Sequence, residues 1–333
     1  MVIRYWCAAV LVAVLACPAA NGQAALVPGE HSEVLNGVRL WYKVAGMPHA
    51  GQAPLLYLHG GPGYNSYSFE RTIGARLERH TQIIYLDERG CGRSERPPDR
   101  NYAMPTLVED IEALRRHLGV PQLSLMGHSF GGTIALEFAA HYAERVKKLV
   151  LLDAAADMPA AFGLWERDIK RRYPSTWLAV TASEEFKVQQ EATRHGDQCA
   201  IGKAEFAVDI FALGKIDGAA FHHWQQFHDQ HYEREQDALD AASGLHNTGE
   251  FSTAYFGPGS DFPCYRFTDY KSLTMPVLVI VGKYDEAVGA DSMRSLAAHL
   301  PQAQFDQFEL SAHFPYAEQP AKFERDVAAF LEK

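Results

Sequence analysis

A serine in a glycine-rich turn is the residue of this chain best suited to nucleophilic chemistry. Ser129 lies within Gly127–Gly132 (GHSFGG), which follows the apolar run Leu123–Met126 and precedes a helical stretch over Thr133–Tyr142. A strand, a tight turn and a helix with serine at the apex would hold the hydroxyl in a strained, accessible position, and glycines let the chain approach such a turn closely. The alternative is that Ser129 only caps the helix, which is a common use of serine.

A serine hydroxyl is a weak nucleophile, so it needs a general base and an acid that orients the base. Asp285 follows the β-branched run Val277–Val281, and His313 follows a further strand-like segment. Catalytic groups gather beyond the carboxyl ends of parallel strands. We therefore expect His313 to take the proton of Ser129 and Asp285 to orient His313. Glu286, the next residue, is the alternative acid.

The loop His59–Gly63 (HGGPG), directly after the apolar run Leu55–Leu58, is suited to stabilise the negative charge that attack on a carbonyl creates. Gly61 has no side chain to cover its N–H, and the residue after the nucleophile, Phe130, would supply the second donor. Preorganised donors of this kind contribute about 3 to 4 kcal/mol each. Taken alone, the same segment reads as an ordinary glycine-proline turn.

Strand-like and helical segments alternate along the chain, which predicts a mostly parallel sheet covered by helices on both faces. The pair Asn36–Gly37 lies between two strand-like runs and predicts an antiparallel hairpin at the start of the sheet. Thr106 and Glu109 form a capping-box pattern, which predicts the start of a helix at this point.

The alternation stops in one long internal segment. Residues 159–267 are instead helical, aromatic-rich and charged, and the strand pattern returns after them. The sequence therefore predicts an α/β core formed by residues 25–158 and 268–333, with an inserted helical cap over 159–267. Such a cap would roof the active site and shape the substrate pocket.

The chain resembles the prolyl iminopeptidases and related serine aminopeptidases of the α/β-hydrolase fold. The likeness rests on His59–Gly63, on Asp87–Ser94 (DERGCGRS) and on the serine turn. It extends over residues 33–156 and again from residue 273 to the end, whereas the intervening segment is much less alike.

The resemblance implies that Ser129, Asp285 and His313 form a catalytic triad, with Gly61 and Phe130 as the oxyanion donors. Such a triad works through an acyl-enzyme that water then hydrolyses, and it needs no metal and no organic cofactor. The substrate would be a small peptide, amide or ester.

Two residues of the DERGCGRS segment are charged, but no step of acyl transfer needs them. We expect Asp87 and Arg89 to organise the loop around the active site rather than to react. Cys91 is expected to be a small buried residue and not a nucleophile.

The predicted cap departs from the family pattern. Family members carry tryptophan after the nucleophile and a segment W-x-x-W-E, whose glutamate receives the amino terminus of the substrate. This chain has Phe130 and the segment Trp224–Asp229 (WQQFHD), with His228 at the glutamate position. We take Trp224, His228 and Asp229 as the substrate-binding residues. An unpaired ammonium is costly to bury, so an aminopeptidase would need another anion. The candidates are Asp229, Glu205, Glu233 and Glu250.

Composition places the chain among soluble globular proteins. Of its 333 residues, 47% are hydrophobic and 22% are charged. The formal net charge of -10 argues against a nucleic-acid partner, which would require a basic surface. A histidine cluster over residues 221–231 lacks the spacing of a metal site, so no metal site is predicted there.

The N-terminus has the pattern of a targeting segment. Arg4 precedes the apolar stretch Tyr5–Ala16, which is too short for an ordinary membrane span. We expect a signal peptide over residues 1–24, cleaved after Ala24, and export to the periplasm or the exterior. The alternative is a lipoprotein signal that ends at residue 16 and leaves a lipidated Cys17 as a membrane anchor.

After removal of such a signal, Cys91, Cys199 and Cys264 remain. In an oxidising compartment, a bond between Cys199 and Cys264 would tie two parts of the cap together and leave Cys91 free. Spacing alone does not establish the connectivity.

Three functions fit these observations. The first is an exported serine aminopeptidase that releases N-terminal proline or another small residue. The second is a carboxylesterase or amidase that uses the same triad on small esters or amides. The third is a non-catalytic binding protein on a hydrolase fold, since fold does not determine function. The sequence does not predict the oligomeric state.

Overall fold

The computed structural model describes residues 26–216, 226–245, 249–257 and 259–333. The predicted signal segment, with Cys17, lies outside these residues. Within them, strands form one 8-stranded sheet in the spatial order β1-β2-β4-β3-β5-β6-β7-β8. The strands are β1 (Gly29–Leu35), β2 (Val38–Ala45), β3 (Leu55–Leu58), β4 (Ile83–Asp87), β5 (Leu123–His128), β6 (Val146–Leu152), β7 (Val277–Gly282) and β8 (Ala303–Phe308).

The sheet begins antiparallel and continues parallel. β1 pairs antiparallel with β2, and β2 with β4, whereas β4, β3, β5, β6, β7 and β8 run parallel. At the β1–β2 turn, Asn36 and Gly37 have φ angles of 48° and 81°, in the left-handed region that this dipeptide tolerates. Both the hairpin and the mostly parallel sheet predicted from the sequence are confirmed.

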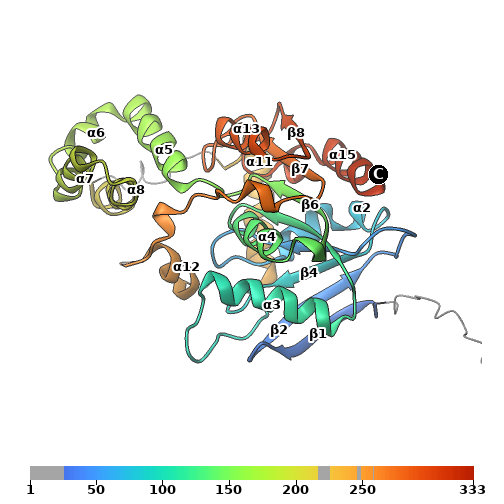
Figure 1. Ribbon diagram of the computed structural model, residues 1–333. Coiled ribbons are helices and arrows are strands. Elements are labelled where there is room, and N and C mark those ends of the chain that lie inside the picture. The colour runs from blue at the N-terminus through green and yellow to red at the C-terminus, as the bar shows by residue number, and fades with distance from the viewer. Residues whose placement is uncertain (1–25, 217–225, 246–248, 258) are drawn as a thin grey trace, which may run out of the picture.

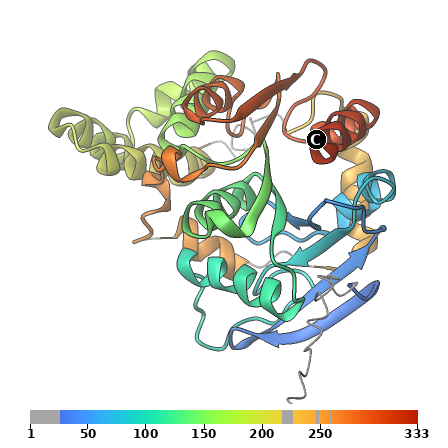
Figure 2. The ribbon, with the colours of Figure 1, turned by 45° about the vertical axis from the view of Figure 1, so that its right-hand side comes forward.

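Alternate strand residues build two apolar layers. Leu56 and Leu58 of β3 face one cluster, and Leu55 and Tyr57 face the other. Helices cover both faces, as predicted (Figures 1 and 2). One layer includes α3 (Met104–His117), α4 (Phe130–His141) and α13 (Ala290–His299), and the other includes α1 (Tyr67–Phe69), α2 (Ala75–Leu77), α14 (Pro315–Glu318) and α15 (Pro320–Glu332).

The start of α3 differs from the prediction. The helix begins at Met104 after Ala103, and no side chain caps it. The Thr106 hydroxyl instead donates to Asn101 Oδ1 over 3.1 Å. Pro105 occupies the first turn, where its missing N–H and fixed φ favour helix initiation. The capping-box prediction at Thr106 is therefore wrong, because the helix begins before Thr106, at Met104.

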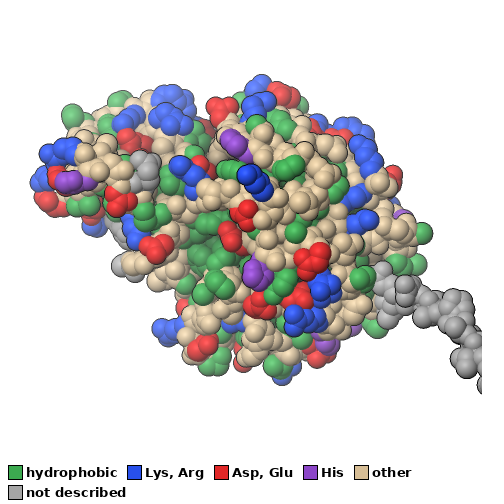
Figure 3. Space-filling view, in the orientation of Figure 1, with side chains coloured by type: hydrophobic (Ala, Val, Ile, Leu, Met, Phe, Trp, Pro, Cys, Tyr) green, Lys and Arg blue, Asp and Glu red, His purple; other side chains and the backbone are tan. Residues whose placement is uncertain are grey.

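Between β6 and β7 the described chain is helical. Its helices are α5 (Met158–Arg172), α6 (Pro174–Val180), α7 (Glu184–His195), α8 (Gln198–Phe206), α9 (Leu213–Ile216), α11 (Gln230–Ser243) and α12 (Gly249–Phe256). In Figure 1, α5 to α8 form a lobe beside the sheet, and α12 lies near α3. Figure 3 shows hydrophobic side chains gathered between that lobe and the body of the molecule. No helix in the described ranges is both long and apolar enough to cross a bilayer.

The two ends of this insertion lie side by side. Asp157 and Arg266 form an isolated antiparallel bridge and an ion pair of 2.9 Å. Next to it, the Met158 N–H donates to the Tyr265 carbonyl over 2.9 Å. The chain therefore leaves and re-enters the core through one short two-stranded neck, which we call the 157–266 neck.

A disulfide bond joins Cys199 of α8 to Cys264, which follows α12. The pairing proposed from the sequence is confirmed. Cys91 is free and buried, as expected. The bond links two parts of the insertion that are 65 residues apart in the chain.

Candidate active site

Ser129 stands at a strained turn between β5 and α4. Its φ and ψ are 53° and −120°, in the left-handed half of conformational space that non-glycine residues avoid. The main chain holds it there: the Ser129 N–H donates to the Leu152 carbonyl, and the Ser129 carbonyl accepts from the Ala155 N–H, each over 3.0 Å. The side chain makes no capping bond to the helix. The alternative that Ser129 only caps α4 is therefore wrong.

The glycines around Ser129 are a steric requirement. A Cβ on Gly127 would lie 2.3 Å from the Gly131 carbonyl oxygen, and a Cβ on Gly131 would lie 2.3 Å from the Leu58 carbonyl oxygen. Real Cβ atoms do not approach backbone so closely, so β3, β5 and α4 can meet at the turn only with glycine at both positions. This packing lets α4 begin directly after the serine.

His313 and Asp285 are joined by a hydrogen bond at the carboxyl ends of β8 and β7. His313 Nδ1 donates to Asp285 Oδ2 over 3.0 Å, and both side chains are buried. Asp285 Oδ1 accepts from the N–H groups of Ala287 and Val288 at 2.7 and 3.0 Å. Burial raises the pKa of Asp285, but the charge and hydrogen bond of His313 outweigh it and lower that pKa to about 2. Asp285 is therefore ionised at neutral pH.

Glu286 points elsewhere. Its carboxylate pairs with Arg172 of α5. The geometry thus separates two adjacent acids: Asp285 is bonded to His313, and Glu286 links the loop after β7 to the insertion.

The backbone of His313 is fixed from two sides. Its N–H donates to the carbonyl of Gln226, which belongs to the insertion, over 2.9 Å. Its carbonyl accepts from His128 Nε2 over 2.9 Å. Burial and the proximity of His313 lower the pKa of His128 to about 3, so that ring stays neutral. The histidine proposed as the base is therefore held by β5 and by the insertion together.

Gly61 and Phe130 flank Ser129. Gly61 is exposed, has a φ of 126° and lines the same cavities as Ser129. Phe130 is the first residue of α4, and its ring is buried against Tyr255 of α12 and Phe262, with ring centroids 4.5 and 5.3 Å away. Phe130 replaces the tryptophan of the family pattern, and the insertion packs directly onto it.

Three charged residues of the DERGCGRS segment, Asp87, Arg89 and Arg93, are engaged with one another or with neighbouring segments. Asp87 accepts from Arg93 Nε over 2.7 Å and from the Ser66 hydroxyl over 2.7 Å. Arg89 forms a two-pronged bond with Asp110, over 2.5 and 2.6 Å. These contacts support the expected structural role: Asp87 holds the loop after β4 to Ser66, and Arg89 ties that loop to Asp110 of α3.

An apolar cavity of about 350 Å³ opens on one side of Ser129. Ser129, His313 and Gly61 line this cavity, and the insertion supplies about half of the lining residues. The apolar lining includes Phe130, Met158, Trp165, Phe206, Phe256 and Phe262. This space suits an uncharged, ring-sized group.

A second cavity, of about 320 Å³, is lined by the same Ser129, His313 and Gly61 and also by an acidic face of α11. Its described lining includes no lysine or arginine. We call this space the acidic cavity; its α11 residues are Glu233, Gln236, Asp237 and Asp240. Asp240 accepts hydrogen bonds from the Tyr64 hydroxyl and from Gln236, and burial raises the pKa of Asp240.

Two of the predicted substrate-binding residues, His228 and Asp229, are engaged away from Ser129. Asp229 caps α11, accepting from the His231 N–H over 2.8 Å. His228 is exposed and stacks on Tyr284, with ring centroids 4.0 Å apart. Neither residue lines the two cavities. Trp224 lies outside the described residues.

The other candidate anions, Glu205, Glu233 and Glu250, lie in three different surroundings. Glu250 pairs with Arg100 over 2.8 Å. Glu205 lies near Glu166, and burial, followed by the charge of Glu166, raises the pKa of Glu205 to about 7. Among these candidates only Glu233 lines the acidic cavity.

Sequence reasoning missed Asp237 and Asp240. Together with Glu233 they stand at positions i, i+4 and i+7 of one helix, the spacing of residues that share a helix face. That periodicity was the available signal. It did not reveal that the face would be turned toward Ser129.

The sheet and the strained serine turn between β5 and α4 are features of the α/β-hydrolase fold. Residues 53–191 match the protein family described as the alpha/beta hydrolase fold. The chain therefore has the α/β-hydrolase fold, as the sequence predicts.

Within this class, the chain is similar to proline iminopeptidases. It is 28% identical to the proline iminopeptidase of Heyndrickxia coagulans over 293 residues, which cover 85% of this chain and 92% of that relative. It is 29% identical to the proline iminopeptidase of Lactobacillus delbrueckii subsp. lactis over 294 residues, covering 84% and 90%. The resemblance predicted from the motifs is confirmed.

Solved structures share the fold. A proline iminopeptidase-related protein of Thermus thermophilus superposes with a TM-score of 0.69 at 19% identity, covering 92% of this chain and 98% of that one. An esterase of Exiguobacterium antarcticum superposes with a TM-score of 0.61 at 20% identity, covering 92% and 100%. Proteins named as peptidases and as esterases thus share this architecture, so the substrate must be argued from the site.

Proposed function

We propose that this protein is a serine aminopeptidase that releases a small N-terminal residue, such as proline, from peptides. Ser129 would be the nucleophile, His313 the general base and acid, and Asp285 the group that orients His313. The His313–Asp285 bond and the shared position of Ser129 and His313 at both cavities support these roles.

The reaction then has two halves. Ser129 Oγ attacks the amide carbonyl carbon while its proton passes to His313 Nε2, and the resulting oxyanion is bound by the N–H groups of Gly61 and Phe130. His313 returns the proton to the leaving amine as the C–N bond breaks, which leaves an acyl-enzyme. Water, deprotonated by His313, attacks this ester and releases the free amino acid and the restored serine.

The acidic cavity is the observation that carries the aminopeptidase proposal. A free N-terminus brings a positive charge beside the scissile bond, and that charge must be paired if the site closes over it. Glu233, Asp237 and Asp240 supply anions in the cavity that contains Ser129 and His313. The names of the relatives at 28 to 29% identity support the same substrate class.

A carboxylesterase or amidase is the second candidate. His228 stands where the family pattern has its amine-binding glutamate, and the apolar cavity would accept an uncharged acyl or alcohol group. A protein that only binds ligands would have no use for the strained serine and its ordered histidine.

The two enzymes are separated by kcat/KM on prolyl and alanyl 4-nitroanilide, on their N-acetylated forms and on 4-nitrophenyl butyrate, with Ser129→Ala as the control. An aminopeptidase cleaves the free-amine anilides, and N-acetylation of these substrates abolishes their turnover. Turnover of the butyrate ester alone would overturn the aminopeptidase proposal in favour of an esterase.

We also propose that the chain is exported. The apolar N-terminal segment and the Cys199–Cys264 disulfide support an oxidising destination. Cell fractionation and mass spectrometry of the mature N-terminus test this: cleavage after Ala24 favours a signal peptide, a lipidated Cys17 favours the anchored form, and an intact Met1 in the cytosol contradicts both.

A further inference from the structure

The ring of His128 has one nitrogen in a hydrogen bond to the main chain and one nitrogen without a proton. His128 Nε2 donates to the His313 carbonyl over 2.9 Å, and a carbonyl oxygen can only accept, so the ring proton is on Nε2. Nδ1 therefore keeps its lone pair. Burial, followed by the charge of His313, lowers the pKa of His128 to about 3, so Nδ1 is an acceptor at neutral pH.

This acceptor has no partner within the described part of the chain. No described residue donates to Nδ1, although the side chain is only 3% exposed. His128 lines the acidic cavity, and Nδ1 is not one of the unpartnered polar atoms that the described residues seal from solvent. Nδ1 is therefore open to a donor on a ligand in that cavity.

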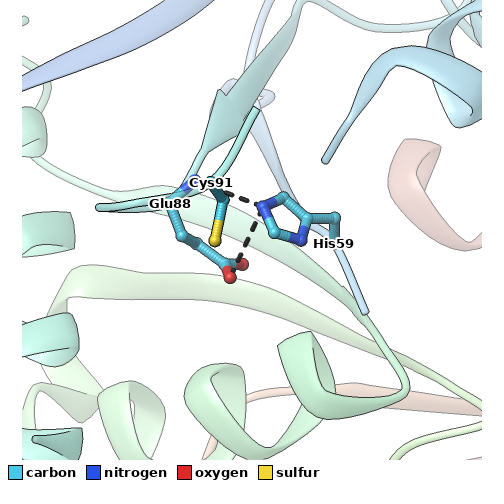
Figure 4. A group of neighbouring side chains, drawn as sticks. All are labelled: His59, Glu88 and Cys91. Carbon is cyan, nitrogen blue, oxygen red and sulfur yellow. Dashed lines mark hydrogen bonds and ion pairs between the residues drawn. The ribbon is translucent and has the colours of Figure 1, made fainter. Parts of the chain in front are cut away.

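Nδ1 lies next to the nucleophile, on one side of Gly60. A Cβ on Gly60 would lie 2.9 Å from Ser129 Cβ and 3.3 Å from His128 Nδ1. A side chain at residue 60 would thus crowd both atoms. The buried ring of His59 holds Gly60 in place, because His59 Nδ1 donates to the Gly60 carbonyl over 2.9 Å. Figure 4 shows the other nitrogen of His59 facing Glu88, whose main-chain N–H it accepts over 3.2 Å.

An N-terminal ammonium would have to lie in this region. Its nitrogen is two bonds from the scissile carbonyl carbon, a separation of about 2.5 Å, so it stays close to Ser129 during attack. Glu233 and Asp237 line the same cavity but are exposed, which suits them to supply negative charge at its open side. His313 Nε2 is assigned to the serine proton. Of the described ring nitrogens in this cavity, His128 Nδ1 is the acceptor that remains.

We propose that His128 Nδ1 accepts a hydrogen bond from the N-terminal ammonium of the substrate, beside Ser129, while the acids of α11 supply the compensating negative charge. The proposal rests on the proposed function and adds to it the residue that receives the amine. The two nitrogens of His128 then have separate roles: Nε2 holds the backbone of His313, and Nδ1 holds the substrate.

Two substitutions separate the two nitrogens of His128. Asparagine can place its amide oxygen near the position of Nδ1 but has no group at Nε2, whereas glutamine can reach the position of Nε2 with an amide N–H and has no acceptor at Nδ1. Each substitution is made in the Ser129→Ala protein, which cannot turn the ligand over. Calorimetry then measures Kd for alaninamide, which has a free ammonium, and for N-acetylalaninamide, which does not.

The two variants should differ only for the charged ligand. We expect His128→Gln to raise Kd for alaninamide by about tenfold or more, because a charge-assisted hydrogen bond is lost. His128→Asn should keep this Kd within about threefold, and Kd for N-acetylalaninamide should be the same in both. His141→Gln is the matched control, since His141 is an exposed histidine at the other end of α4, and both Kd values should stay unchanged there.

Thermal unfolding identifies any variant that fails to fold, and His128→Leu then replaces His128→Gln as the variant without the acceptor. An equal Kd for alaninamide in this variant and in His128→Asn would overturn the proposal. A folded Ser129→Ala protein that does not bind alaninamide would also overturn it. Failure of the proposed function appears differently, as a wild-type protein that does not cleave the free-amine anilides.

Discussion

Asp153 and Asp285 follow the neighbouring strands β6 and β7, and their carboxyl groups lie within 4.8 Å of each other and of a His313 ring nitrogen. Asp153 is buried with a φ of 42°, and its Oδ1 accepts the Gly282 N–H over 2.9 Å. Two adjacent buried carboxyls cannot both ionise readily. Burial, followed by the charge of Asp285, raises the pKa of Asp153 well above its usual range. Asp153 is therefore the neutral member and Asp285 the charged one.

This division gives a pH-dependent stability. A carboxyl whose pKa is raised in the folded state contributes most below its unfolded pKa, and this contribution is lost as pH rises toward the folded pKa. In Asp153→Asn the neutral form is permanent. We therefore expect Tm of Asp153→Asn minus Tm of wild type to be more positive at pH 7.5 than at pH 4. A difference that is independent of pH would mean that Asp153 is ionised in the folded protein.

Ser129→Ala should abolish turnover without unfolding the protein. Removal of a nucleophilic serine typically lowers kcat by about 10⁶-fold, and the left-handed backbone at residue 129 does not depend on the hydroxyl. Steady-state kinetics and circular dichroism measure the two properties. Wild-type activity in a folded Ser129→Ala protein would place the active site elsewhere.

The two neighbouring acids should behave differently. Asp285→Asn should lower kcat by about 10⁴-fold, since the base loses its orienting carboxylate. Glu286→Gln should keep kcat within about threefold, because Glu286 is paired with Arg172 and not with His313. The reverse order of the two effects would reassign the acid to Glu286.

The acidic cavity should bind the ammonium group of a substrate and should have no effect on substrates that lack this group. We expect the double variant Glu233→Gln/Asp237→Asn to raise KM about tenfold for alanyl 4-nitroanilide, since each charge-assisted bond to the ammonium is weakened. KM for 4-nitrophenyl butyrate should not change. Glu235→Gln is the matched control, because Glu235 is on the same helix but pairs with His231. An equal loss in the control would indicate a nonspecific effect of the helix charge.

Removal of the Cys199–Cys264 bond should lower the stability of the insertion more than it lowers the enzymatic activity. A disulfide of this kind typically contributes about 2 to 4 kcal/mol, and neither cysteine lines the cavity walls. Cys199→Ala/Cys264→Ala should therefore unfold at lower denaturant concentration, and dithiothreitol should no longer affect it. Loss of activity at full stability would show instead that the bond shapes the site.

The residues proposed as the triad could be selected from the sequence because each depends on a local pattern. Ser129 and Asp285 follow the buried strands β5 and β7, His313 follows the more polar strand β8, and parallel strands bring their carboxyl ends to one edge of the sheet. A strand of this type needs no knowledge of distant residues to be recognised. The same is true of the Asn36–Gly37 hairpin.

The insertion could not be predicted in this way. The position of Asp229 beside a family motif predicts a role in substrate binding, but its carboxylate caps the helix that begins at the next residue. The acids that do line a cavity, Asp237 and Asp240, are recognisable as a helix face, yet the direction of that face depends on contacts with Tyr64 and the core. Helix orientation is a tertiary property, and no local spacing encodes it.

The 157–266 neck would allow the whole insertion to be replaced by another segment without changing the core. Because its two ends enter and leave side by side, the strands that carry Asp285 and His313 need not shift when a segment of another length or shape is grafted there. A grafted segment would also have to supply the carbonyl that accepts the His313 N–H, as Gln226 does here. Substrate range can thus diverge between relatives while the reaction stays constant.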